Sequence, residues 1–209
     1  MFDLSSFGAA MAVYVIGTAS PGPGNLAIAN TSLSYGRTPG LALAAGVISG
    51  SLCWGAMTAA GVSALLMSNN QVLVWLKILG ACYLLWLAYK SIRGALSPNA
   101  VNLKRVKARQ SRTLGFYLQG LGIHLTNPKA ALTWFTVTTV GLSATAPSWA
   151  SFVLVGSCAV AGFVIFCAYA LAFSARSAEP FFVRTRKAFG LLCGAFYSMV
   201  AAGFIGSLL

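Results

Sequence analysis

The feature that most constrains this chain is a pair of proline-containing breaks inside long apolar runs. The first break is Ser20-Pro21-Gly22-Pro23-Gly24-Asn25, and the second is Thr126-Asn127-Pro128-Lys129. Proline removes a backbone donor and glycine loosens the chain, so each break frees backbone polar groups. In hydrocarbon such groups are costly, and they are tolerated only against protein or a polar cavity. Paired breaks in the two halves of a chain therefore predict the substrate site of a transporter.

Composition places the chain among integral membrane proteins. Of its 209 residues, 58% are hydrophobic and 8% are charged, values far from those of soluble domains. The net charge of +12 could suggest a nucleic-acid partner, but the basic residues cluster between apolar runs, as in cytoplasmic loops. We expect no nucleic-acid partner. The five cysteines fall inside apolar runs without a close pair, so we expect packing roles, no metal site and no cofactor.

The apolar runs predict an all-α, polytopic membrane protein with six transmembrane helices, of which the first and fourth are broken. One transmembrane transporter domain, 1–209, accounts for the whole chain. The expected spans are 4–35 with the first break inside, 41–67, 72–89, 114–140 with the second break inside, 149–173 and 189–209.

A split within the central loop gives two halves of three spans each. The halves are about 1–95 and about 113–209, and a basic loop of about 90–112 joins them. An odd number of spans in each half forces the halves into opposite orientations, which predicts two inverted repeats. The Gly46/Gly50 pair has the small-xxx-small spacing of a helix face that packs closely on another helix.

The distribution of basic residues predicts the orientation of the chain. Twelve of the fourteen lysines and arginines, including Arg37, fall on one side of the six spans, and none falls on the other. Basic loops are retained in the cytoplasm. We therefore expect a cytoplasmic loop at 90–112 and both termini outside.

Two lysines and one histidine lie inside predicted spans. A lysine at a helix centre costs about 2.5–3.5 kcal/mol on insertion scales. Lys129 adjoins a break and lies near the middle of its span, whereas Lys77 is close enough to one end to snorkel. His124 lies one turn before Pro128, and it is either a packed, hydrogen-bonded side chain or a proton carrier.

Seven motifs are spread along nearly the whole chain. They are Pro21-Gly22-Pro23, Gly36-Arg37-Thr38-Pro39-Gly40, Gly46-Val47-Ile48-Ser49-Gly50, Gly80-Ala81-Cys82-Tyr83-Leu84-Leu85-Trp86, Gly120-Leu121, Leu125-Thr126-Asn127-Pro128-Lys129-Ala130 and Arg186-Lys187-Ala188-Phe189-Gly190. In these motifs the chain resembles the LysE/RhtB superfamily of amino-acid exporters over essentially its whole length. The resemblance implies proton-driven efflux of small amino acids or their analogues across a bacterial inner membrane.

No Asp or Glu lies in a predicted span, so we expect a neutral rather than a cationic amino acid. Lys129 and the positive ends of the half-helices could hold its carboxylate, while Asn25, Asn127 and freed carbonyls could hold its ammonium. The predicted substrate-binding residues are Pro21, Gly22, Pro23, Gly24, Asn25, Asn127, Pro128 and Lys129. The candidates for proton coupling are Lys129, His124 and Lys77.

Other functions stay open at this point. An intramembrane enzyme would need a nucleophile with a base, or a metal cluster, but His124 is the single histidine and has no carboxylate partner in a span. The chain could also be a non-transporting membrane subunit or an exporter of another small metabolite. The expected partners are a small amino acid, protons and the lipid bilayer, and a homodimer is allowed.

Overall fold

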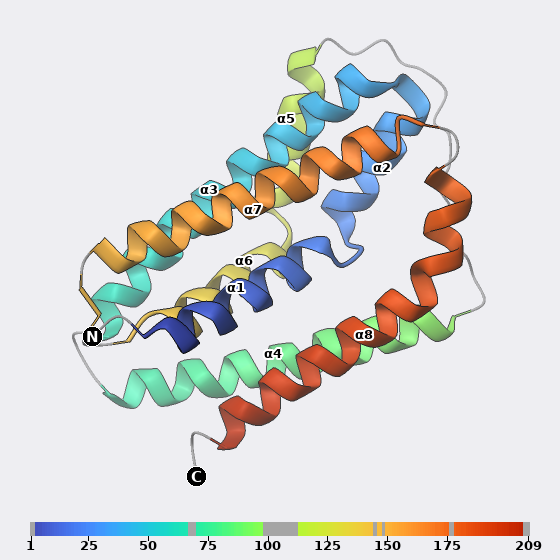
Figure 1. The fold of residues 1–209 in the computed structure, drawn as a ribbon. Helices are drawn as coiled ribbons and strands as arrows, with labels where there is room; N and C mark the ends of the chain where they lie inside the picture. Colours follow the sequence, from blue (N-terminus) through green and yellow to red (C-terminus); the bar gives the residue numbers. More distant parts are fainter. Residues whose placement is uncertain are drawn as a thin grey trace.

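A computed structural model describes residues 3–66, 70–97, 113–143, 146–147, 149–175 and 178–206. Within these ranges all regular structure is helical, which confirms the all-α prediction (Figure 1). The helices are α1 (Leu4–Ala19), α2 (Pro23–Tyr35), α3 (Arg37–Leu66), α4 (Asn70–Leu96), α5 (Thr113–Leu125), α6 (Pro128–Gly141), α7 (Trp149–Ala172) and α8 (Ala178–Gly206).

Both predicted breaks are present, and they are built in the same way. At the first, α1 ends at Ala19, the chain is extended at Gly22, and Pro23 begins α2. At the second, the chain is extended at Asn127 and Pro128 begins α6. Proline is favoured at this first helical position because its missing N–H would have had no partner in the helix. The helix axis bends by 46° between α1 and α2.

The first helix begins with an acidic cap. The carboxylate of Asp3 accepts hydrogen bonds from the backbone N–H groups of Ser5 and Ser6, at 3.1 and 3.2 Å. An N-cap of this kind satisfies donors that have no partner within the helix. Hydrogen bonds from the side chains of Ser6 and Ser5, together with those from their amides, lower the pKa of Asp3 to about 2.

Length and composition identify membrane-crossing helices. Among the described residues, the segment Arg37–Gly61 of α3 and the whole of α7 are long and apolar enough to cross a bilayer. The bent pair α1–α2 passes the same test when it is taken as one broken span.

Two predicted boundaries between helix and loop are wrong. Helix α4 continues past Tyr89 to Leu96, so Lys90 and Arg93 are helical, and α8 already begins at Ala178. The reason is that charge marks where the chain leaves the hydrocarbon, whereas a helix satisfies its own backbone and continues into water until a breaker stops it. The remainder of the predicted loop, 98–112, lies outside the described residues.

The helices pack in pairs that are distant in the sequence. Helix α3 packs between α5 and α7, α1 lies along α6, and α4 pairs with α8 (Figure 1). The predicted small-residue face is confirmed, since a Cβ added at Gly46 would overlap the carbonyl oxygen of Tyr117 in α5. At Gly50 an added Cβ would lie 2.9 Å from the Cβ of His124.

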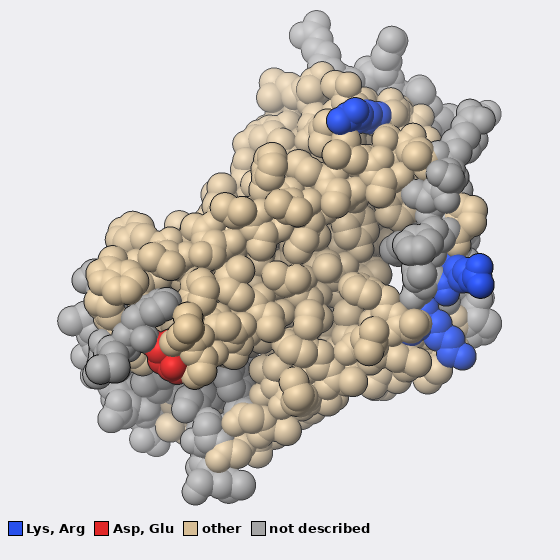
Figure 2. All heavy atoms as spheres, viewed as in Figure 1, with Lys and Arg blue, Asp and Glu red and all other residues tan. Residues whose placement is uncertain are grey.

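Charge is separated along the bundle. Arg37, Lys90 and Arg93 are exposed near the ends of α3 and α4, and Asp3 is exposed at the start of α1. In the view of Figure 2 the basic side chains lie towards the right-hand end, and the acidic side chain lies at the opposite end. The described surface between them shows no charged side chain in this view, and α7 exposes large apolar side chains such as Phe152, Val160 and Phe163, as expected for a helix that faces lipid.

Candidate functional site

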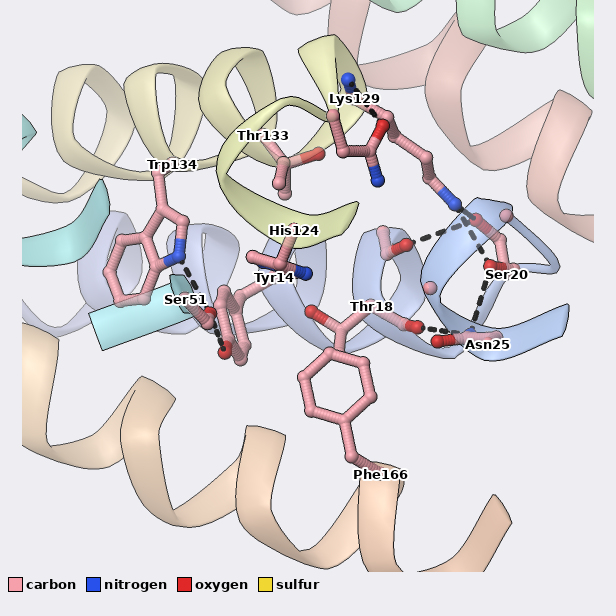
Figure 3. A pocket seen from close by; sticks show the side chains of 15 residues that line it. Tyr14, Thr18, Ser20, Asn25, Ser51, His124, Lys129, Thr133, Trp134 and Phe166 are labelled. Atoms are coloured by element: carbon pink, nitrogen blue, oxygen red, sulfur yellow. Dashed lines mark hydrogen bonds between the residues drawn. The ribbon is translucent and has the colours of Figure 1, made fainter. Parts of the chain in front are cut away.

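The two breaks line one cavity between the helices (Figure 3). Its volume of about 40 Å³ is room for about three water molecules, at roughly 10–15 Å³ each. Helices α1, α2, α3, α5, α6 and α7 all contribute to its walls. Six of the residues singled out in the sequence line it, namely Gly22, Gly24, Asn25, His124, Asn127 and Lys129.

The three break prolines are not among the residues that line this cavity. Pro23 and Pro128 instead begin α2 and α6, so that the N-terminal residues of both helices face the cavity. Lys77 lies in α4, but its side chain is outside what the structure describes. The substrate-binding and proton-coupling roles of all these residues stay predictions.

Lys129 connects the two breaks. Its Nζ atom donates a hydrogen bond of 2.9 Å to the backbone carbonyl of Ser20, and a second hydrogen bond joins it to the hydroxyl of Ser20 (Figure 3). An ammonium group that is withdrawn from water needs such oxygens as hydrogen-bond partners. Gly22 makes room for the stem of the lysine, since an added Cβ would lie 3.3 Å from both Cδ and Nζ. An ammonium group has three donors, so one N–H remains for a ligand.

The two asparagines stabilise the breaks. The amide of Asn25 donates to the carbonyls of Thr18 at 2.7 Å and Ser20 at 3.2 Å, which lost their helical partners at the break. The side-chain oxygen of Asn127 accepts from the backbone N–H of Lys129 at 3.1 Å, as an N-cap. Each asparagine therefore satisfies backbone groups that its own break has freed.

His124 is buried, with 7% of its surface exposed, and it lines the cavity. Its ring packs edge-on against Phe166, with ring centroids 5.8 Å apart. Within the described part of the chain its Nδ1 atom has no hydrogen-bond partner. A buried polar atom without a hydrogen-bond partner lowers the stability of the fold.

The sequence did not identify the other wall of the cavity. Ser51 accepts a 2.9 Å hydrogen bond from the indole N–H of Trp134, and its hydroxyl also lies 3.2 Å from the hydroxyl of Tyr14. The rings of Tyr14 and Trp134 are 5.0 Å apart (Figure 3). The one available signal was a set of polar or amphipathic side chains inside apolar runs. That signal does not say which helices meet.

Among the described residues no three His, Cys, Asp or Glu side chains are grouped closely enough to hold a metal ion. Hydroxyls, amides, one lysine and one imidazole remain. These groups can bind a small zwitterion through hydrogen bonds and charge.

A family profile described as LysE type translocator matches residues 15–207. The chain belongs to the LysE type translocator family. This confirms the resemblance read from the break motifs. The family is one of transporters, and its members are membrane proteins.

Named relatives agree with this assignment. The leucine efflux protein of Klebsiella pneumoniae is 29% identical over 190 residues, which cover 90% of this chain and 87% of that protein. The threonine efflux protein of Escherichia coli is 27% identical over 124 residues, 57% of this chain and 58% of that protein. The membrane protein YahN of Escherichia coli is 25% identical over 193 residues, 92% of this chain and 86% of that protein. No solved structure matches the LysE type translocator described here.

Proposed function

We propose that this LysE type translocator is a secondary exporter of small, neutral amino acids or their analogues, driven by proton antiport across the bacterial inner membrane. The observation that carries the proposal is Lys129, which bridges the two helix breaks at the wall of a shared cavity. Relatives named for the efflux of threonine and leucine support a neutral amino acid.

The cavity suits the carboxylate end of such a substrate. Lys129 retains one N–H after its two bonds to Ser20, and the N-terminal ends of α2 and α6 open on the same space. A helix N-terminus carries partial positive charge, so both half-helices add to the attraction for an anionic group. In this proposal Gly22 and Gly24 let the carboxylate approach the backbone closely.

Two groups at the cavity could carry the coupled proton. Lys129 and His124 both line it, and each could exchange a proton as the site opens to either side. Lys77 is the third candidate, and its part is a prediction from sequence. Proton coupling at any of these residues requires that protonation and substrate release alternate.

We also propose six spans arranged as two inverted three-helix repeats. In Figure 1 the C-terminal ends of α2, α4 and α7 lie towards one end of the bundle. The C-terminal ends of α3, α6 and α8 lie towards the other end. Helices at equivalent places in the two halves pack on each other, α3 on α7 and α4 on α8. The contact of α1 with α6 is matched by that of α2 with α5, as a two-fold relation between halves requires.

The basic residues set the orientation in this proposal. The ends of α3 and α4 that carry Arg37, Lys90 and Arg93 face the cytoplasm, and both termini face outward. Association as a homodimer is a further prediction.

Of two alternatives, one has a specific reason against it and the other is separated by experiment. A non-transporting membrane subunit would not need an intramembrane lysine held between two breaks above a cavity. An exporter of another small metabolite would use the same cavity, so a substrate screen separates it from an amino-acid exporter.

Replacement of Lys129 tests the proposal. Lys129→Met keeps the length of the side chain but removes its charge, so export from cells fed dipeptides should fall to background. If Lys129 binds the carboxylate, Lys129→Arg should keep part of the binding. If it carries the proton, Lys129→Arg should transport without response to a pH gradient, since arginine does not release its proton.

The matched control is Lys187→Met, because Lys187 is an exposed lysine in α8. This control should export at the wild-type rate at equal membrane abundance. Gradient-driven export by the Lys129→Met protein at the wild-type rate would contradict both roles.

A further inference from the structure

The expected acceptors for the ammonium group of a neutral amino acid are Asn25, Asn127 and the freed carbonyls of the breaks, and the structure shows which bonds these groups already make. Their role rests on the proposed function, in which Lys129 takes the carboxylate. Asp3 is exposed at the start of α1, and the side chain of Glu179 lies outside the described part of the chain. Every described residue that lines the cavity offers only neutral acceptors to the ammonium group.

The freed carbonyls of the first break already accept hydrogen bonds from side chains of the protein. Each of the three carbonyls before Pro21 accepts a hydrogen bond from a side chain. The donors are Asn25 Nδ2 for Thr18 (2.7 Å), the hydroxyl of Tyr169 for Ala19 (2.8 Å) and Lys129 Nζ for Ser20 (2.9 Å). One turn earlier, the carbonyl of Gly17 accepts from the hydroxyl of Ser20 at 3.0 Å.

The asparagines are tied to the two breaks. Asn127 uses its side-chain oxygen to cap α6, and Asn25 is held by the hydrogen bonds of its amide N–H groups to backbone carbonyls, which leaves its side-chain oxygen as an acceptor. Removing either group from its present partner would expose unsatisfied backbone at a break, which is costly in a membrane interior.

We infer that Nδ1 of His124 accepts a hydrogen bond from the ammonium group of the transported amino acid. It is a polar atom on a side chain that is more than nine-tenths buried, without a partner in the described part of the chain, on the wall of this cavity. A Cβ added at Gly24 would lie 3.8 Å from it, so the first turn of α2 passes close to the imidazole.

The chemistry of the imidazole fits this role. With its proton on Nε2, a neutral histidine presents an acceptor lone pair at Nδ1. A hydrogen bond from an ammonium to this atom is charge-assisted and stronger than one between neutral groups. His124 on α5 and Lys129 on α6 then take the two charged groups of one zwitterion.

The test compares an amino acid with the same molecule lacking its amine. Purified protein in proteoliposomes is assayed by counterflow of radiolabelled L-leucine and L-threonine. The competitors are the unlabelled amino acids and their des-amino analogues, 4-methylpentanoate and 3-hydroxybutanoate. Wild-type protein should bind the amino acid more tightly than its analogue by about tenfold or more, the effect of one hydrogen bond to a charged group.

Variants of His124 assign this discrimination to one atom. His124→Leu and His124→Phe lack an acceptor, and His124→Phe also keeps a ring against Phe166. Both should bind amino acid and analogue with nearly equal affinity, while His124→Gln, which offers an amide oxygen, should keep part of the preference. Phe166→Leu is the matched control because it alters the packing of the same ring without removing an acceptor, so it should change both affinities by the same factor.

The outcomes separate the inference from the function on which it rests. If wild-type protein exchanges neither amino acid, the proposed neutral substrate is wrong and the inference falls with it. If it exchanges them but does not discriminate against the analogues, the inference alone is wrong. Full discrimination by either acceptor-free variant would also overturn the role of His124 and leave the exporter intact.

Discussion

At the scale of single residues, a serine hydroxyl organises the wall of the cavity opposite the lysine. Ser51 on α3 takes the indole N–H of Trp134 from α6 and lies beside the hydroxyl of Tyr14 from α1. All three side chains are almost fully buried. Gly55 lies directly against the indole, since an added Cβ would be 2.7 Å from it, so α3 restricts movement of the Trp134 ring. Side chains from α1, α3 and α6 therefore form this wall of the cavity together.

Replacing Ser51 by alanine should destabilise the protein. The indole N–H of Trp134 would lose its acceptor while still buried, which costs about 1–3 kcal/mol. We expect a lower midpoint of thermal unfolding for the purified protein in detergent.

Ser198→Ala is the matched control, because within the described residues the hydroxyl of Ser198 bonds to the Gly194 carbonyl of its own helix. Its stability should stay within about 0.5 kcal/mol of wild type. Equal midpoints for the two variants would show that Ser51 does not support Trp134.

At the scale of helices, the closest approach is between α3 and α5. It is reciprocal: an added Cβ at Gly46 would overlap the carbonyl oxygen of Tyr117, and one at Gly120 would overlap the carbonyl oxygen of Leu43. Two backbones therefore touch without intervening side chains, as small residues allow in membranes. His124 lies one turn beyond Gly120, so this contact also fixes the position of the imidazole.

Gly120→Ala should push α5 away from α3. Overpacking of this kind costs about 1–3 kcal/mol, and displacement of His124 should lower export as well. Gly122→Ala is the control on the same helix, because nothing lies within 4 Å of its added Cβ. That change should be neutral or stabilising by up to about 1 kcal/mol, since alanine is the better helix former. Similar unfolding midpoints for the two variants would contradict the close contact.

The helices and their breaks could be predicted because each is a local property of the sequence. Apolar runs, prolines at first helical positions and the glycine face at Gly46 act through near neighbours. The helix ends at Leu96 and Ala178 could not be predicted from the basic residues nearby, because a charge does not end a helix. The partners of Lys129, and the group around Ser51, depend on how distant helices cross. The cost of a charge inside a membrane span singled out Lys129 in the sequence, and the structure shows that its hydrogen-bond acceptors are the carbonyl and the hydroxyl of Ser20.

At the scale of the whole molecule, the cavity is small for an amino acid. Room for about three waters means that the surrounding helices must move apart before a substrate enters. In transporters such movement is a rocking of one bundle against the other around a fixed site. The link between Lys129 and Ser20 joins the two halves, so it is the contact that a substrate carboxylate would share or replace.

The proposed orientation can be checked at the end of α4. Ser97→Cys in a background without the five native cysteines places a single thiol at the described edge of the central loop. A membrane-impermeant thiol reagent should label it in inverted vesicles and leave it unlabelled in intact cells. Labelling in intact cells would reverse the orientation.

The bridge from Lys129 to Ser20 also bears on how the chain is made. The two residues are 109 positions apart, so the ribosome delivers the carbonyl acceptor long before the lysine. A nascent span 114–140 that enters the bilayer alone would carry Lys129 near its middle, at a cost of about 2.5–3.5 kcal/mol. Because the first half is made earlier, the carbonyl of Ser20 is already present when Lys129 is inserted, and it can accept the hydrogen bond of the lysine at once. We therefore expect that synthesis of the N-terminal half first lowers the free-energy cost of inserting Lys129.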